Sequence, residues 1–209
     1  MSEPRETADQ LEEVAEGLYH WRISNSAIGG NVSSSHALVT GVTCVLIDPV
    51  RLAEDAMASL PRPTAIVLTA RCHQRSAWRY RVEFGIEVWL PEDASAADEE
   101  PDRRYADGDV LPGGLIAVRT PGPEWPHYSL LLEDDPGVVF CSDLVMHAGD
   151  GVLRFVPPEF HEDPGETRRS VEKLLGLPFA VLCFDHGAPL VDDPTAALRR
   201  LLGSPAEAG

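Results

Sequence analysis

The sequence predicts an α/β domain, and its patterning and its length both support this. Short apolar runs with strand character alternate with amphipathic, helix-like segments along most of the chain. With 209 residues, of which 44% are hydrophobic, the chain is long enough to bury one core. The two ends lack this alternation. We therefore expect one domain over residues 17–202, with a flexible acidic arm at 1–16 and a flexible tail at 203–209.

The first half of the chain begins with three predicted strands and a helix. The third strand ends in Asp48 and Pro49, and the helix carries an apolar residue at every fourth position until Pro61 and Pro63 end it. A further strand then leads into a polar loop, a second helix that Gly85 ends, and a short strand. The predicted strands are 17–23, 36–40, 43–47, 65–69 and 86–90, and the predicted helices are 51–60 and 75–84.

The second half opens with residues 91–108, which are rich in Asp, Glu, Ala and Pro and predict a solvated excursion with few apolar residues. Apolar strands return after it, followed by two helices that flank one more strand. Asp193 and Pro194 are typical of a helix start, with the aspartate as cap and the proline in the first turn. The predicted strands are 115–120, 128–133, 137–141 and 179–184, and the predicted helices are 166–175 and 194–202.

The formal net charge of −17 limits the partners of the protein. An acidic surface repels phosphates and anionic lipid, so we expect neither nucleic acid nor a membrane surface as a partner. Of the 17 basic residues only Lys173 is a lysine, which fits either a GC-rich genome or a halophile. No stretch reaches the roughly 18 apolar residues of a membrane span, and the first 16 residues lack the parts of a secretory signal. We therefore expect a cytoplasmic protein.

The cysteines predict free thiols. They show no C-x-x-C spacing, which argues against a structural zinc site. Three of them lie in apolar runs, where a free cysteine behaves as a small buried hydrophobe, and Cys72 alone lies in a polar loop. In a reducing cytoplasm we expect no disulfide between them. The four are Cys44, Cys72, Cys141 and Cys183.

Five short motifs, in the same order along the chain, resemble the metallo-β-lactamase superfamily, which includes glyoxalase II-like hydrolases. They are TCVLIDP at 43–49, AIVLTARCHQR at 65–75, TPGP at 120–123, VFCSDL at 139–144 and FDHGAP at 184–189. Each is weak evidence alone, but the shared order makes the resemblance specific over residues 17–202. The resemblance implies an αββα sandwich, in which two mixed sheets face each other and helices cover the outer faces.

The resemblance also implies a two-metal site, whose ligand positions this sequence has largely changed. The family signature His-x-His-x-Asp-His and the third histidine of the first metal fall on Ala70, Cys72, Gln74, Arg75 and Pro123. Only Asp143, at the bridging aspartate, and His186, at the last histidine, stand as the family has them. Zinc catalysis needs three protein ligands and an open position for water. The resemblance therefore implies the fold without most of its metal chemistry.

One hypothesis keeps a metal ion. Cys72, Asp143 and His186 would then form an atypical site for zinc or another divalent ion, with thiolate, carboxylate and imidazole ligands. Arg71 and Arg75 flank Cys72, and their charges lower the pKa of a thiol but oppose a cation. Cys72 would otherwise serve as a nucleophile. In either form, the hypothesis predicts a hydrolase of an ester, thioester or amide.

The sequence favours the other hypothesis, a non-catalytic pseudoenzyme with no cofactor. An unpaired buried carboxylate costs several kcal/mol, so without a metal ion Asp143 requires a positive partner. We therefore predict that Arg75 or Arg71 pairs with Asp143. The former metal cleft, formed by Arg71, Arg75, Asp143 and His186, would then bind a small anionic ligand or a protein partner. The alternative for Arg71, Arg75, Arg79 and Arg81 is a salt-bridged surface that neutralises local carboxylates.

Two more histidines lie close to these motifs. His73 is one residue out of register with the lost ligands, so we expect a surface or hydrogen-bonded side chain. His127 follows the TPGP motif, and we expect it to point along the next strand without a metal role.

Overall fold

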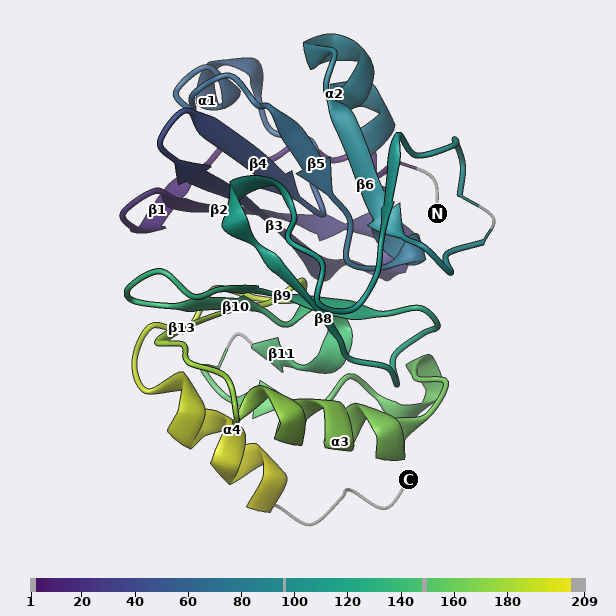
Figure 1. The fold of residues 1–209 in the computed structure, drawn as a ribbon, viewed down its shortest axis with the longest axis vertical. Coiled ribbons are helices and arrows are strands. Elements are labelled where there is room, and N and C mark those ends of the chain that lie inside the picture. The colour runs from purple at the N-terminus through teal and green to yellow at the C-terminus, as the bar shows by residue number, and fades with distance from the viewer. Residues whose placement is uncertain (1–2, 96, 148–149, 204–209) are drawn as a thin grey trace.

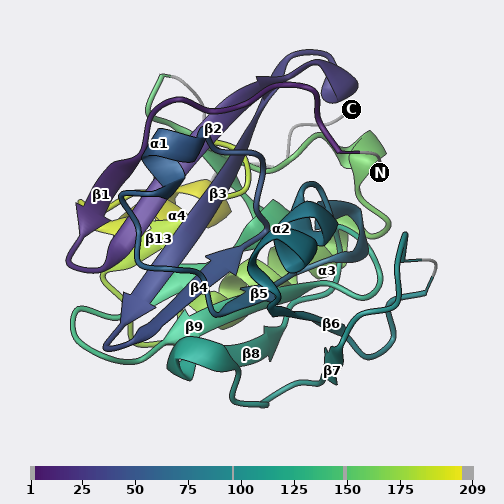
Figure 2. The ribbon, with the colours of Figure 1, turned by 90° about the horizontal axis from the view of Figure 1, so that it is seen from above.

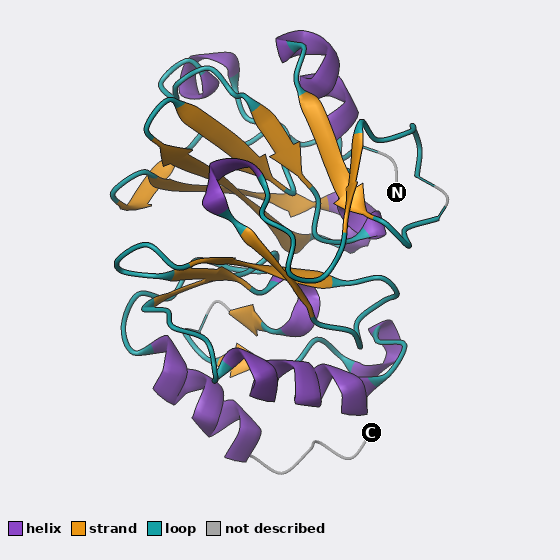
Figure 3. Ribbon diagram, viewed as in Figure 1, coloured by secondary structure: helices purple, strands orange, loops and turns teal. Residues whose placement is uncertain are grey.

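The computed structural model describes residues 3–95, 97–147 and 150–203. It has four layers in the order helix, sheet, sheet, helix (Figures 1 and 3). Helices α1 (Glu54–Met57) and α2 (Ala77–Phe84) cover the outer face of the first sheet. Helices α3 (Pro164–Leu174) and α4 (Pro194–Gly203) cover the outer face of the second sheet. This is the αββα sandwich that the resemblance implied.

Within the described residues, the first sheet has seven strands that follow one another in sequence order (Figure 2). The first four pair in antiparallel fashion, and the last four run parallel. Parallel strands place their carboxyl ends along one edge of a sheet, where ligands usually bind. The strands are β1 (Glu12–Ala15), β2 (Leu18–Asn25), β3 (Asn31–Thr40), β4 (Thr43–Ile47), β5 (Ala65–Val67), β6 (Glu87–Pro91) and β7 (Arg103–Tyr105).

The described part of the second sheet has four strands in the order β13-β10-β9-β8. β10 runs parallel to β13 and antiparallel to β9, so β10 and β13 also end side by side. Two very short strands, β11 (Met146–His147) and β12 (Leu153–Arg154), form a separate ribbon. The strands of the second sheet are β8 (Ile116–Arg119), β9 (Tyr128–Leu132), β10 (Val138–Phe140) and β13 (Val181–Cys183).

The period-two alternation of side chains along the strands separates three apolar cores. In β4, Leu46 packs under α1 and α2, whereas its neighbour Val45 faces the second sheet. In β10, Val139 packs on α3 and α4, whereas Phe140 faces the first sheet. Both sheets are thus buried on two faces, which explains why their strands are continuous apolar runs.

Two boundaries predicted from the sequence were wrong. The predicted arm enters the domain, because Glu12–Ala15 pair with β2 and the buried Ala8 hydrogen-bonds to the backbone of Arg51 and Ala53. The excursion at 91–108 contains β7, which the polar pair before Tyr105 concealed. Tyr105 is buried, and its hydroxyl donates to the carbonyl of Leu68 (2.7 Å).

The predicted tail lies outside the described residues beyond Gly203. Within residues 3–95, 97–147 and 150–203, no helix has the length and apolar character that crossing a membrane requires.

Candidate functional site

Four strands from the two sheets end at one place and deliver its polar side chains. In the first sheet, Asp48 follows β4 and His73 follows β5 after a short turn. In the second sheet, Asp143 follows β10 and Asp185 follows β13. The site therefore lies at the carboxyl ends of parallel neighbours in both sheets, where the sequence placed it.

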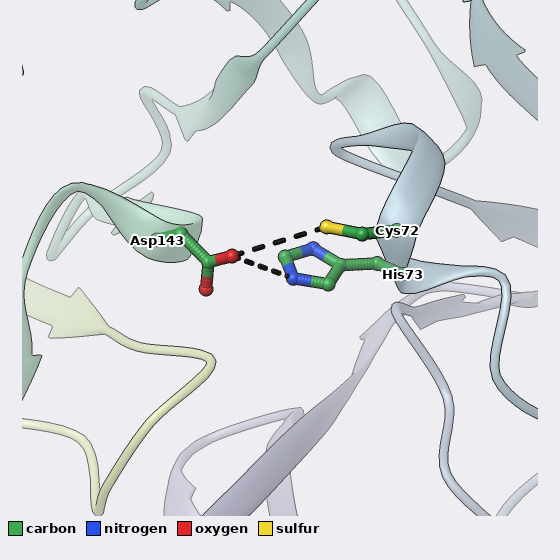
Figure 4. Close-up of side chains that lie close together, drawn as sticks. All are labelled: Cys72, His73 and Asp143. Carbon is green, nitrogen blue, oxygen red and sulfur yellow. Dashed lines mark hydrogen bonds and ion pairs between the residues drawn. The ribbon is translucent and has the colours of Figure 1, made fainter. Parts of the chain in front are cut away.

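The 3₁₀ turn Arg71–His73 determines which side chains of the changed motif face inward. His73 is buried, Cys72 is half-buried, and the side chain of Arg71 is 43% exposed. Cys72 and His73 approach from this turn and Asp143 from the opposite sheet (Figure 4). The residue next to the lost ligand positions, rather than a residue at one of them, therefore occupies the centre of the site.

Each ring nitrogen of His73 faces a carboxylate. Nδ1 lies 2.7 Å from Asp185 Oδ2, and Nε2 lies 3.0 Å from Asp143 Oδ2. Burial lowers the pKa of His73, but the charges of Asp143 and Asp185 outweigh burial and hold this pKa well above its ordinary value. His73 is thus an imidazolium that joins the two sheets through two buried ion pairs.

Asp143 interacts with residues from several elements. His186 Nε2 lies 3.2 Å from its Oδ1, and Cys72 Sγ lies 4.0 Å from its Oδ2. The backbone N–H of Asp143 donates to His127 Nε2 (3.2 Å). Burial raises the pKa of Asp143, but His73 and His186 outweigh burial and hold it well below its ordinary value. Asp143 Oδ1 nevertheless has no hydrogen-bond partner among the described residues.

The prediction that Arg75 or Arg71 pairs with Asp143 was wrong. The guanidinium of Arg75 is buried, donates to two backbone carbonyls of β3 and the β4 end, and reaches Asp185 Oδ2 at 3.3 Å. Arg71 pairs with Glu124 at 3.6 Å. Arg75 therefore pairs with Asp185, the carboxylate at the other ring nitrogen of His73. The partner that Asp143 requires is imidazolium, from His73 and His186, and not guanidinium.

The pKa values of two buried carboxylates behind His73 are shifted in opposite directions. Burial and the charge of Asp185 raise the pKa of Asp48 to about 6. Asp48 Oδ1 accepts the backbone N–H of Thr69 (2.9 Å), and the Thr69 hydroxyl donates to its other oxygen. Burial also opposes ionisation of Asp185, but His73 and Arg75 lower its pKa to about 2. Asp185, together with Asp143, therefore stabilises the His73 imidazolium electrostatically.

Cys72 is a poor nucleophile in this arrangement. Burial raises the pKa of its thiol to about 11, which is the opposite of the lowered pKa of a catalytic cysteine. Its backbone N–H donates to Glu124 Oε1 (3.0 Å), which fixes the turn. Deprotonation of this thiol near neutral pH therefore requires a bound cation.

The donors fit a zinc-type metal ion better than the sequence indicated. Among the described residues, Cys72, His73 and Asp143 offer three ligand atoms within 4.8 Å of one another. Ligands held at about 2.0–2.3 Å from zinc lie roughly 3–4 Å apart, and Asp143 Oδ2 lies 3.0 Å from His73 Nε2 and 4.0 Å from Cys72 Sγ. Thiolate, imidazole and carboxylate are all zinc ligands. His186 lies outside this group, next to the other oxygen of Asp143.

A second group, Asp48, His73 and Asp185, meets the same distance criterion but fits a metal ion less well. All three residues are buried, and Thr69 already occupies both oxygens of Asp48.

Sequence reasoning missed His73, Asp185 and His127 as parts of the site. His127 was expected to point along its strand, but its buried ring lies against the Asp143 backbone, and its Nδ1 donates to Thr120 O (2.7 Å). Asp185 stands directly before His186. Asp143 and Asp185 each follow an apolar strand, and this pattern could have indicated a buried cation between them.

Comparisons with solved structures identify the same fold. The metallo-β-lactamase from Erythrobacter litoralis matches with a TM-score of 0.67 at 16% identity, over 92% of this chain and 89% of that one. FIM-1 from Pseudomonas aeruginosa, in its mono-zinc form, matches with a TM-score of 0.71 at 12% identity, over 94% and 95%. A metallo-β-lactamase family protein from Thermus thermophilus matches with a TM-score of 0.65 at 16% identity, over 91% and 79%.

Neither a protein-family model nor a curated protein sequence matches this chain. At such low identity the solved structures show the fold alone, so the chemistry has to be argued from the residues described above. The chain has the metallo-β-lactamase fold.

Proposed function

We propose that this protein binds a single divalent metal ion, zinc in the first instance, through Cys72, His73 and Asp143, and that it is a hydrolase. The observation that supports this proposal is the convergence of three different zinc-type donors within 4.8 Å, at the carboxyl ends of the central strands. The metal hypothesis from the sequence used Cys72, Asp143 and His186 as ligands, and the present proposal replaces His186 with His73.

The surroundings of these donors support a metal ion. Metal-bound histidines usually hold their second nitrogen against a carboxylate, which fixes the ring and raises its basicity, and Asp185 stands in that position at 2.7 Å from Nδ1 of His73. The hydrogen bond from Cys72 N–H to Glu124 orients the thiol. Arg75, which the sequence set against a cation, directs its guanidinium to Asp185 and away from Asp143.

The site has room for a substrate. The side chains of Asp143 and His186 are 19% and 18% exposed, so one side of the donor group is open to solvent. Glu124 also lines a neighbouring cavity of about 450 Å³, together with Trp125 and Glu162. A bound metal ion with an open position supplies Lewis acidity and lowers the pKa of water. The chain itself orients the ligands and holds His186 beside Asp143. The substrate that we propose is an ester, thioester or amide, and the cytoplasmic location stays a prediction from the sequence.

A second candidate is the metal-free pseudoenzyme, and one observation favours it. His73 already bridges Asp143 and Asp185 as an imidazolium, so a proton satisfies the carboxylates where the family uses metal. In that case Arg71, the exposed arginine at the cleft, is the group for a small anionic ligand.

Metal content separates the two candidates. The purified protein, loaded with zinc and dialysed, is expected to retain about one ion per chain, and Cys72→Ser and His73→Gln are each expected to lose it. Cys44→Ala removes a buried thiol from the outer core of the first sheet and serves as the matched control. Zinc retention that is equal in all four proteins, or absent from the wild type, would reject the metal site in favour of the pseudoenzyme. Hydrolysis of ester, thioester and amide panels by the loaded protein then tests the activity.

A further inference from the structure

His161 carries a buried ring nitrogen that no interaction explains. The Thr167 hydroxyl donates to the carbonyl of Asp163 (3.1 Å), so its oxygen accepts from Nδ1–H of His161 (2.9 Å). Burial lowers the pKa of His161, which keeps the ring neutral near pH 7. The proton of the neutral ring therefore lies on Nδ1, and Nε2 presents a lone pair. This Nε2 is buried and has no partner among the described residues.

Backbone hydrogen bonds hold the segment after His161 against the loop that contains Pro123, the position of the family's third histidine. Glu162 N–H donates to Pro123 O (3.1 Å), and Asp163 N–H donates to Gly122 O (2.9 Å). A Cβ on Gly122 would lie 2.3 Å from the backbone nitrogen of Thr167, so this close approach requires a glycine. His161 thus stands directly before a residue bonded to Pro123.

The charge of Asp143 raises the pKa of His161 and partly offsets the lowering by burial. The ring therefore has its Nδ1 oriented by a hydroxyl, its Nε2 lone pair free, and a carboxylate of the donor group nearby. A metal-ligating histidine has the same organisation, with one nitrogen fixed and the other available.

We propose that His161 is a further ligand of the metal ion, supplying from a neighbouring loop the imidazole that Pro123 lacks. This inference rests on the proposed function, since it requires a metal ion at Cys72, His73 and Asp143. His161 lies outside the group of donors within 4.8 Å of one another, so ligation would require its ring to move toward Asp143. Structural sites for zinc use four protein ligands, and this movement would complete such a set when no substrate is present.

The test is imidazole ¹⁵N NMR combined with zinc affinity from competition with a chromogenic chelator. In the metal-free protein we expect His161 as the Nδ1–H tautomer. On addition of zinc we expect its Nε2 resonance to shift to the range of a metal-bound nitrogen. His161→Gln is expected to weaken zinc binding by roughly tenfold or more. Thr167→Val, which removes only the orienting hydroxyl, is expected to weaken it by a smaller factor, and Thr167→Ser is expected to restore it.

The controls distinguish a role of His161 from the proposed metal site on which it depends. His147→Gln removes a half-buried histidine whose Nδ1 bonds to the carbonyl of Ala188, and zinc affinity should not change. Zinc binding by the wild type with an unshifted His161 resonance, and unchanged affinity in His161→Gln and Thr167→Val, would overturn the role of His161 alone. Absence of zinc binding by the wild type would overturn the proposed function and this inference together.

Discussion

Removal of the positive charge between the two sheets is expected to destabilise the metal-free protein. His73→Gln keeps an amide of similar reach but removes the imidazolium that faces Asp143 at 3.0 Å and Asp185 at 2.7 Å. The side chain of His73 is only 4% exposed, so water cannot replace the lost charge. Asp143 would then keep only His186 (3.2 Å) and Asp185 only Arg75 (3.3 Å) as positive partners.

The magnitude follows from the cost of breaking a buried ion pair. Removal of one partner typically costs about 3–5 kcal/mol, because the other charge stays buried and unpaired. Because His186 and Arg75 still face the two carboxylates, we expect the lower end of this range, about 3 kcal/mol. For a chain of this size, about 1 kcal/mol shifts Tm by roughly 2–4 °C, so Tm should fall by about 6–12 °C. Asp185→Asn in the same chain should recover part of the loss, because it removes one of the stranded carboxylates.

The assay is urea unfolding, followed by circular dichroism in the presence of EDTA, for the two single variants and the double variant. The raised pKa of His73 gives stability that is complete below pH 6.5, its unfolded value, and is lost as pH rises through the folded value. The gap between wild type and His73→Gln should therefore be largest near pH 6 and shrink in alkaline solution. A loss below about 1 kcal/mol, or strictly additive variants, would refute the buried ion-pair network.

Two further predictions concern the parts of the fold around the site. Burial, with a smaller effect of Arg22, lowers the pKa of His20 to about 4. The contribution of neutral His20 to the free energy of unfolding is therefore fully present above pH 6.5, and this free energy should fall by about 3 kcal/mol as the pH drops toward 4. Urea unfolding at pH 7 and pH 4.5 tests this, and a fall that is no smaller in His20→Gln would contradict it. Gly122→Ala places a Cβ 2.3 Å from Thr167 N and should cost roughly 1–3 kcal/mol or more. Gly108→Ala, also at positive φ but with no atom within 4 Å, is the control, and equal thermal stability of the two variants would argue against this packing.

The fold could be predicted because its strands are buried on both faces. Thr43–Ile47 was predicted to the residue, since an apolar run with β-branched side chains before Asp48 has few other interpretations. β7 was missed because its three residues, Arg103–Tyr105, place only the tyrosine in the core. An edge strand of this kind has no apolar run to reveal it.

The site could be located from the sequence but not assembled. Its position after β5 was predicted, and Asp143 and His186 do meet at 3.2 Å. The direction of each side chain in the Arg71–His73 turn depends on 3₁₀ geometry, which a linear motif does not encode. As a result, His73 was expected to be a surface or hydrogen-bonded side chain rather than the centre of the site, and Arg75 was assigned to the wrong aspartate. The underlying principle, that a buried Asp143 requires a cation, was sound, and the cation is an imidazolium.

The central claim is that a proton and a metal ion compete for the same donors, and calorimetric zinc titration tests it most directly. Metal ligands must lose their protons, so binding releases them. Near pH 7 the thiol of Cys72, with its pKa near 11, and the imidazolium of His73 should each give up one. Titrations in buffers of different ionisation enthalpy are expected to show one zinc ion bound with about two protons released, and weaker binding at lower pH. Zinc binding without proton release, or no binding between pH 6 and pH 9, would contradict the account.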